Sequence, residues 1–527
     1  MPHPSITAET YPHKPAIIMG ASGEMVTYQQ LDQRSNQGAQ LFRSLGLQAG
    51  DHIGMMLENN RQFLEILWAA QRSGLIFTPI STHLKKHETA YILKNCGAKL
   101  FIGSLALAEV AEQLLAESTG VDHFYMVGGI KPGFESWEEA TDAQPDTPIS
   151  DPSNGAPMLY SSGTTGQPKG VFVEDYDKDV NAPTVLVPTI GVLFGFGEET
   201  VYLSPAPLYH AAPLHYNMLT LYNGGTTVVM EKFDPELALK LIEEQRVTHS
   251  QWVPIMFSRM LKLPQEVREA YDVSSMQVAI HAAAPCPIEI KEKMIEWWGE
   301  IIVEYYAASE GIGVTIIDSA DWLKHKGSVG PVLMGELHIV DDDGNEVPQG
   351  ETGTVYFGGQ QLRFHYHDEP EKTSEAYNDK GWATTGDVGY VDEDGYLYLT
   401  DRKNFTIISG GVNIYPQEVE NILASHEKVA DVAVFGVPNE EFGEEVKAVI
   451  QPMNWADATD ETAIEIMEWL RERISSIKMP RTMDFHPKLP RMDNGKLYKR
   501  HLVEEYRGAA RSDDKISDSE TDVTDKK

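Results

Sequence analysis

Residues 226–253 read TTVVMEKFDPELALKLIEEQRVTHSQWV, and this stretch decides the fold class. Its opening run from Thr226 to Met230 is short, apolar and β-branched, which predicts a buried strand. Asp234 followed by Pro235 is an N-cap and first-turn pair, and it predicts a helix that ends at about Gln245. A second short strand is expected at 251–253. A strand, a helix and a strand in succession indicate a parallel β/α unit.

The same alternation continues on both sides of this unit. Strands are predicted at 201–203, 276–280 and 301–305, and a helix at 287–298. Nearer the start of the chain, Thr27 and Gln30 form a capping-box pattern that predicts a helix ending near Gly46. We therefore expect an α/β fold whose large N-terminal part consists of parallel-rich β/α subdomains. Ligand sites in such sheets lie in the loops at the carboxyl ends of the strands.

The length of 527 residues exceeds one ordinary core, so more than one domain is expected. Residues 1–400 form the expected large domain. Residues 401–507 are expected to form a small mobile α+β domain, with a strand at 432–437 and a helix at 461–474. Residues 508–527 are almost free of apolar side chains, which predicts a disordered acidic tail.

Charge limits the classes of partner. Lys and Arg number 43 and Asp and Glu 79, giving a formal net charge of −36. Such a surface repels nucleic-acid phosphates, so no nucleic-acid partner is expected. A phosphate site in this chain must be built locally, from backbone N–H groups and a few well-placed cations. The oligomeric state is not determined by the sequence, and a homo-oligomer is compatible with it.

Two further features concern the cellular setting. The two cysteines, Cys96 and Cys286, form neither a disulfide framework nor a zinc site, so a reduced, cytoplasmic location is expected. The most apolar stretch, 182–197, is interrupted by Pro188 and three glycines and is too short to span a bilayer. We expect it to be a buried segment, and we expect no integral membrane segment and no signal peptide.

One loop carries a chemical signature. Tyr160-Ser-Ser-Gly-Thr-Thr-Gly-Gln-Pro-Lys-Gly170 combines hydroxyls, glycines and a lysine. Hydroxyl and backbone N–H groups can surround phosphate oxygens, and the lysine adds a point charge. The loop is not a Walker A motif, because Lys169 follows Pro168 and precedes Gly170.

This string resembles the phosphate loop of the adenylate-forming (ANL) superfamily, which includes acyl-CoA synthetases, adenylation domains of peptide synthetases and firefly-type luciferases. The other motifs of that superfamily follow in order from about Ala21 to Arg500. The resemblance implies a phosphate-binding set of Ser161, Ser162, Gly163, Thr164, Thr165, Gly166 and Lys169.

The resemblance extends to the rest of the nucleotide site. Glu304-Tyr-Tyr-Ala-Ala-Ser-Glu310 resembles the adenine and magnesium motif, which implies Tyr306 on adenine, Ser309 on the α-phosphate and Glu310 on Mg²⁺. It departs from the family pattern at Ala307, where glycine is common, and at Ser309, where threonine is common. The remaining implied nucleotide contacts are Ala283 and Ala284 at adenine, Asp387 at the ribose hydroxyls, and Arg402 at ribose or phosphate.

The remaining motifs concern the acid, the thiol and the domain movement. The resemblance implies that His210 orients the acid and that Lys496, after a turn-forming Asn-Gly pair, is the catalytic lysine. Asp401 is the implied hinge. The implied thiol tunnel for coenzyme A consists of Ser409, Gly410 and Gly411. The implied acyl pocket consists of Trp252, Val253, Met256, Ala282 and Ala307.

These motifs imply an ATP-dependent acid–thiol ligase with Mg²⁺ as cofactor and a carboxylic acid, ATP and coenzyme A as substrates. The largely apolar pocket residues favour a fatty or other apolar monocarboxylic acid. Three alternatives stay open at this point: a stand-alone adenylation enzyme that loads a carrier-protein thiol, a luciferase-like oxygenase, and a non-catalytic nucleotide- or acyl-binding protein.

Overall fold

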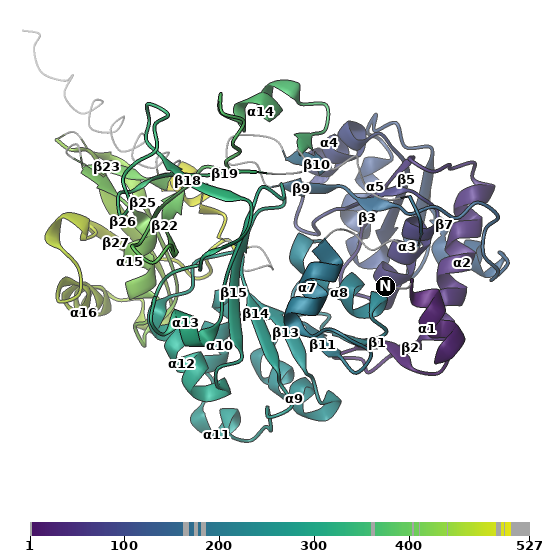
Figure 1. The fold of residues 1–527 in the computed structure, drawn as a ribbon, viewed down its shortest axis with the longest axis horizontal. Helices are drawn as coiled ribbons and strands as arrows, with labels where there is room; N and C mark the ends of the chain where they lie inside the picture. The colour runs from purple at the N-terminus through teal and green to yellow at the C-terminus, as the bar shows by residue number, and fades with distance from the viewer. Residues whose placement is uncertain are drawn as a thin grey trace, which may run out of the picture.

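The computed structural model describes residues 3–161, 168–172, 178–180, 186–359, 364–402, 405–409, 412–439, 441–491, 497–499 and 501–506, without the side chains of 161 and 186–189. The predicted tail at 508–527 lies outside these residues. Figure 1 shows a large N-terminal part and a small C-terminal part at the opposite end from the first helices.

A large twisted sheet organises the middle of the molecule. In the described part of the chain it has nine strands in the order β17-β16-β15-β14-β13-β11-β12-β1-β2. The strands from β15 to β1 pair in parallel, and antiparallel strands lie at both edges. Their bounds are β1 Pro15–Met19, β2 Met25–Thr27, β11 Val201–Ser204, β12 Thr226–Val229, β13 His249–Trp252, β14 Val278–His281, β15 Ile302–Ala307, β16 Val314–Ile317 and β17 Val332–Met334.

The β/α unit predicted from residues 226–253 is confirmed. Helix α9 (Pro235–Gln245) begins after Asp234, whose carboxylate accepts a hydrogen bond from the Leu237 backbone N–H at 2.8 Å. The second strand begins two residues before the predicted 251–253. Strands β12 and β13 are not neighbours, because β11 lies between them. The predicted helix at 287–298 corresponds to α12 (Ile288–Trp298).

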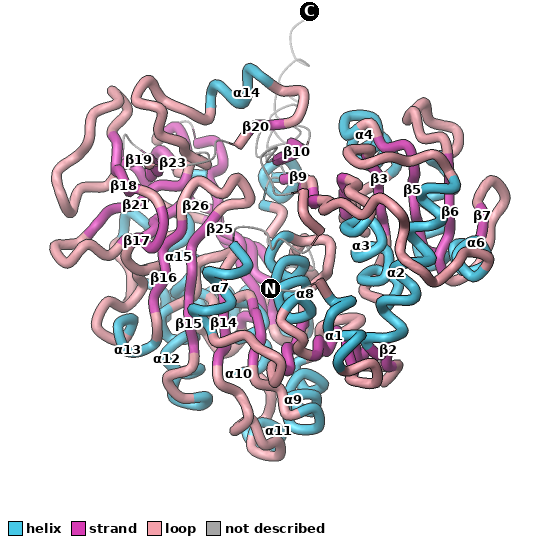
Figure 2. Tube along the Cα trace, turned by 45° about the vertical axis from the view of Figure 1, so that its right-hand side comes forward, coloured by secondary structure: helices cyan, strands magenta, loops and turns pink. Residues whose placement is uncertain are grey.

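A second, smaller sheet carries the N-terminal subdomain. In the described residues it has six parallel strands in the order β7-β6-β5-β3-β4-β8. These are β3 His52–Met56, β4 Ile76–Pro79, β5 Ala98–Ser104, β6 His123–Val127, β7 Glu135–Ser136 and β8 Ala156–Pro157. Figure 2 shows α2 (Tyr28–Ser44) and α3 (Arg61–Arg72) between the two sheets. One apolar core joins residues of these helices with residues of both sheets.

The capping box predicted at the start of α2 is confirmed. The Gln30 backbone N–H donates to the Thr27 hydroxyl at 3.3 Å, and the Thr27 N–H donates to the Gln30 side chain at 2.9 Å. The other helices of the large domain in the described residues include α1 Pro4–Thr10, α4 Lys86–Cys96, α5 Ala108–Leu114, α6 Trp137–Asp142, α8 Ala211–Tyr222, α10 Pro254–Leu261, α11 Gln265–Arg268, α13 Ser319–Trp322 and α14 Pro370–Glu375.

The apolar stretch at 182–197 is not buried throughout, so that prediction is wrong in part. It contains α7 (Leu186–Phe194), in which Val192 is 78% and Leu193 45% exposed, whereas Phe194 and Phe196 are buried. The reason is geometric: only one side of a helix can face the protein. No helix in the described ranges combines the length and apolarity needed to cross a bilayer.

Two small antiparallel sheets lie in the described residues outside the two large ones. One contains β9 Leu159–Ser161, β10 Lys169–Phe172 and β20 His365–Tyr366. The other contains β18 Glu336–Val340, β19 Gly353–Gly358, β21 Asp387–Val391 and β22 Leu397–Arg402. Strand β22 ends at the start of the C-terminal part.

The C-terminal part is a small α+β domain with its own apolar core. Its long antiparallel pair contains the strand predicted at 432–437, and its last long helix covers most of the helix predicted at 461–474. The elements are β23 Ile407–Ser409, β24 Val412–Ile414, α15 Pro416–Leu423, β25 Val429–Asn439, β26 Gly443–Pro452, α16 Asp460–Arg471 and β27 Thr482–Phe485.

Candidate active site

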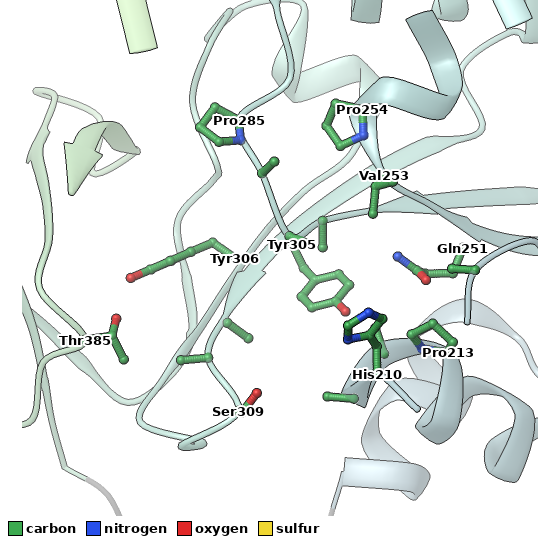
Figure 3. A pocket seen from close by; sticks show the side chains of 18 of the residues that line it. His210, Pro213, Gln251, Val253, Pro254, Pro285, Tyr305, Tyr306, Ser309 and Thr385 are labelled. Atoms are coloured by element: carbon green, nitrogen blue, oxygen red, sulfur yellow. The ribbon is translucent and has the colours of Figure 1, made fainter. Parts of the chain in front are cut away.

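A cavity of about 750 Å³ opens at the carboxyl ends of β13, β14 and β15, where the central sheet faces the small domain (Figure 3). This is the position at which parallel sheets bind ligands. Residues of β10, the start of α8, the end of β22, α15 and the start of β25 also contribute to its lining. Its volume is within the range of small-molecule sites.

One wall of the cavity carries Asp387, whose carboxylate accepts hydrogen bonds from three side chains. The Tyr306 hydroxyl donates to Oδ2 of Asp387 at 2.7 Å, and the Thr385 hydroxyl donates to the same oxygen at 2.8 Å. Nε of Arg402 donates to Oδ1 at 3.2 Å. Burial, followed by the Asp387 charge, holds the pKa of Tyr306 well above its usual value, so this phenol stays a neutral donor. Three predicted nucleotide residues therefore meet here, and Thr385 joins them.

A second polar group gathers around Glu310. The Tyr366 hydroxyl donates to Oε1 of Glu310 at 3.0 Å, and Nζ of Lys169 lies 4.5 Å from the centroid of the Tyr366 ring. The pairing of β20 with β10, in which Tyr366 lies opposite Val171, brings Tyr366 to Glu310. Local sequence carried no signal for Tyr366, because its role depends on a pairing across almost two hundred residues.

The residues at this end fit a magnesium ion. Mg²⁺ takes hard oxygen ligands and often binds through one or two carboxylates together with substrate phosphates. Glu310 lines the cavity and offers such a carboxylate, close to the predicted phosphate cation Lys169. Within the described residues no group of three or more His, Cys, Asp or Glu side chains could hold an ion by itself. The Glu310 carboxylate is a hard oxygen ligand of the kind that Mg²⁺ takes together with substrate phosphates.

The loop after β14 has an unusual backbone. Ala282, Ala283 and Ala284 all line the cavity, and Ala283 has φ of 75°. A left-handed conformation is uncommon for a residue with a β-carbon and costs roughly 1–2 kcal/mol. The small side chains leave room for a flat ring to approach the backbone. Ser309 lines the cavity in the loop after β15.

A buried ion pair supports both loops from behind. Nζ of Lys291 lies 2.6 Å from Oε2 of Glu304, and the two side chains are 0% and 6% exposed. Nε2 of His281 lies 3.5 Å from the same oxygen, and the Lys291 ammonium is 4.7 Å from the centroid of the Trp322 ring. Burial raises the pKa of Glu304, while the Lys291 charge opposes that rise. The pair ties α12 to β15, and Glu304 itself lines the cavity.

His210 stands at the opposite side of the cavity. It is the N-cap residue of α8, and its ring centroid is 4.4 Å from that of Tyr209. In Figure 3 the Tyr305 hydroxyl points toward the His210 ring. The wall beside them is mainly apolar and aromatic. It includes Ile190, Leu193, Phe194, Pro213, Tyr216, Leu219, Val253, Pro254, Ile255, Ala282, Tyr305 and Ala307.

Two predicted pocket residues are corrected by the structure. Val253, Ala282 and Ala307 line the cavity as predicted, but Trp252 and Met256 are not among its described lining residues and are 0% and 2% exposed. Alternate side chains of a strand point to opposite faces, so Gln251 and Val253 face the cavity while Trp252 enters the core beneath. Met256 lies on the core-facing side of α10 for the equivalent reason in a helix.

The small domain forms the remaining wall. Oδ1 of Asp401 accepts from the Arg402 backbone N–H at 2.6 Å, and Oδ2 accepts from the Gln417 N–H at 3.0 Å, so one carboxylate joins the end of β22 to the first turn of α15. Nζ of Lys262, at the end of α10, donates to the Val429 carbonyl at 2.5 Å across the domain boundary. Burial lowers the pKa of Lys262 to about 8.

Some predicted site residues lie outside the described residues: Ser162, Gly163, Thr164, Thr165, Gly166, Gly410, Gly411 and Lys496. The Ser161 backbone belongs to β9, but its side chain is not described. Leu497, next to Lys496, lines the cavity. Ser409 pairs with Gly443 and is not among the described lining residues, so the predicted thiol tunnel stays a prediction.

Two protein-family models match this chain. The family model of AMP-binding enzymes matches residues 5–367, and that of the AMP-binding enzyme C-terminal domain matches residues 418–496. The chain belongs to the AMP-binding enzyme family. This family membership, together with the relatives that follow, makes it one of the AMP-forming acid–thiol ligases.

Relatives of this AMP-binding enzyme are similar to it in sequence along nearly the whole chain. A feruloyl-CoA synthase of Amycolatopsis sp is 33% identical over 93% of this chain and 96% of the relative. The long-chain-fatty-acid–CoA ligase FadD13 of Mycobacterium tuberculosis is 30% identical over 95% and 97%. ATP-bound MatB from Rhodopseudomonas palustris, a solved structure, superimposes with a TM-score of 0.77 at 26% identity, covering 96% of this chain and 99% of its own.

Proposed function

We propose that the protein is an acyl-CoA synthetase that converts a carboxylic acid, ATP and coenzyme A into acyl-CoA, AMP and diphosphate through an acyl-adenylate. The acid is an apolar monocarboxylic acid of the fatty or ring-bearing kind. The observation that carries this proposal is the single cavity in which the predicted nucleotide residues stand beside a mainly apolar wall. The names of the feruloyl and fatty-acyl relatives support both the thiol and the apolar acid.

The distribution of cations in the cavity supports an acid with one carboxylate. Among the described lining residues the lysines and arginines are Lys169, Arg402, Arg491 and Lys499. None of them comes from α8, β13 or α10, which form the acyl wall. A second carboxylate on the acid would enter this wall without a charged partner, and burying an unpaired charge is strongly unfavourable. Arg402, Arg491 and Lys499 are paired with Asp387, Asp431 and Glu420, which lie away from this wall.

In the proposed first half-reaction the acid carboxylate attacks the α-phosphate, and diphosphate leaves. Two anions must approach each other, so orientation and charge neutralisation are the main contributions of the protein. We assign His210 to orienting the acid and Lys496 to bridging the carboxylate and the departing diphosphate. Asp387 and Tyr306 hold the nucleoside. Glu310 would hold a magnesium ion, which would neutralise part of the phosphate charge.

In the proposed second half-reaction the coenzyme A thiol attacks the acyl carbon, and AMP leaves. The small domain turns about Asp401 between the two halves, so that Ser409, Gly410 and Gly411 come to line the thiol path. Support for the starting orientation comes from Leu497, Tyr498 and Lys499, which line the cavity. The segment next to Lys496 thus faces the site at which the adenylate would form.

The two half-reactions provide the test. The wild-type protein is incubated with ATP, Mg²⁺, coenzyme A and a panel of acids, and diphosphate, AMP and thioester are measured separately. Lys496→Ala is expected to lose adenylate formation by a factor of at least about 100, yet to convert preformed acyl-AMP into thioester at nearly the wild-type rate. Lys488→Ala, an exposed lysine preceding the same segment, is the matched control and should behave as wild type.

The alternatives give different product patterns. Diphosphate and AMP without a coenzyme A thioester would favour loading of a carrier-protein thiol. An absence of AMP with every acid would contradict the ligase assignment and favour a binding protein. Equal loss of both half-reactions in Lys496→Ala would contradict the role given to that lysine.

A further inference from the structure

The acyl wall contains a buried hydrogen-bond acceptor, the amide oxygen of Gln251. Gln251 belongs to β13, is 1% exposed and lines the cavity. Its amide nitrogen donates to the Trp252 carbonyl at 2.8 Å. Its amide oxygen has no hydrogen-bond partner within the described part of the chain. Figure 3 shows the Gln251 amide turned toward Tyr305 and His210, on the cavity side of the strand.

The hydrogen bond to the backbone determines which atom of the Gln251 amide faces the cavity. The Trp252 carbonyl can only accept hydrogen bonds, so it requires the nitrogen of Gln251 and leaves the oxygen for the cavity. Buried polar atoms without partners are rare in folded proteins and disfavour the folded state, so such an atom calls for an explanation. A ligand that fills this part of the cavity would have to present a donor to it.

Three polar groups of the cavity have other partners. The hydroxyls of Tyr216 and Tyr305 hydrogen-bond each other, and burial raises the pKa of Tyr305 to about 12, so both stay neutral. Glu304 is held by Lys291 at 2.6 Å. The carboxylate of the acid cannot satisfy Gln251 either, because it also only accepts hydrogen bonds.

We propose that Gln251 is a specificity-determining residue and that the preferred acid carries a neutral hydroxyl or amino donor on an otherwise apolar, ring-bearing body. This inference rests on the proposed function and specifies its substrate class. A site built to bind a substrate hydroxyl rejects the analogue that lacks it, since the buried acceptor is then left unpaired. The surrounding rings of Tyr216 and Tyr305 and the side chain of Val253 suit a flat apolar body.

The first experiment uses the wild-type protein and matched pairs of acids that differ by one donor. Cinnamate is compared with its ortho-, meta- and para-hydroxy and para-amino derivatives, and dodecanoate with hydroxydodecanoates. We expect kcat/KM for AMP release to be about 10- to 100-fold higher for at least one donor-bearing acid than for its unsubstituted twin. Equal or better use of the unsubstituted acid in every pair would overturn the inference.

The second experiment assigns the preference to Gln251. Gln251→Met keeps the length of the side chain and removes the acceptor, so the preference should fall to about one-fold. Lys293→Met, which changes an exposed residue outside the cavity lining, should leave the ratio unchanged. Equal losses for both members of a pair in Gln251→Met would indicate a structural role and would refute the proposal.

A binding measurement separates this inference from the proposed function. The rise in the melting temperature of the wild-type protein is recorded with each acid of a pair, without turnover. A larger rise with the donor-bearing acid, reduced in Gln251→Met, would support the inference even if no AMP were formed. If AMP is formed but the two acids of each pair give equal kcat/KM and equal rises in melting temperature, the proposed function is supported and the inference about Gln251 is refuted.

Discussion

Replacing Lys291 by methionine should destabilise the large domain far more than replacing both partners of its ion pair. At 2.6 Å the Lys291–Glu304 attraction amounts to ~6 kcal/mol with an effective dielectric constant of about 20. Removing two ions from water costs several kcal/mol each, which offsets most of this gain. The single variant leaves a carboxylate buried without its partner, and such variants lose about 3–5 kcal/mol.

The double variant Lys291→Met/Glu304→Met removes both charges and should unfold within about 1 kcal/mol of the wild type. Thermal unfolding followed by tryptophan fluorescence measures the difference, since Trp322 packs on the Lys291 ammonium. With about 2 °C per kcal/mol for a large domain, the single variant should melt about 6–10 °C lower. A double variant as unstable as the single one would refute the argument.

The pH dependence of the single variant gives an independent check. Without Lys291, burial would hold the folded-state pKa of Glu304 above its unfolded value, since burial already raises it in the wild type. At low pH the carboxyl is protonated in both states, so the deficit is small. As the pH rises through the unfolded and then the folded pKa, the unfolded state loses its proton first and the deficit grows. A deficit that is equal at pH 5 and pH 8 would contradict this reasoning.

Three further changes test other parts of the site. Asp387→Ala should raise KM for ATP by about 10- to 100-fold, because hydrogen bonds to charged groups are lost, and should leave KM for the acid nearly unchanged. Steady-state kinetics measures both constants, and an unchanged KM for ATP would exclude the nucleoside role. Ala283→Gly relieves the left-handed backbone at φ 75° and should stabilise the protein by about 0.5–1 kcal/mol, whereas a lower melting temperature would argue against strain there. Lys262→Met removes the bond to Val429 and should slow adenylate formation more than thioester formation from acyl-AMP, with the exposed Lys293→Met as control. Because burial lowers the pKa of Lys262 to about 8, its effect should diminish above that pH.

Local patterns in the chain were sufficient for most elements and for the family. The capping box at Thr27 and the N-cap at Asp234 are made by residues three positions apart, so the sequence alone determines where α2 and α9 begin. The family's short sequence motifs named Tyr306, Glu310 and Asp387, and all three line the cavity. Each of these depends on neighbours along the chain.

Other features were decided only when distant segments met. Trp252 could be assigned to the core and Gln251 to the cavity only after both faces of β13 were known, because one residue of register reverses the side to which a side chain points. Tyr366 reaches Glu310 only through the pairing of β20 with β10. Burial depends on what packs against a segment, and for these residues the partners come from remote parts of the sequence.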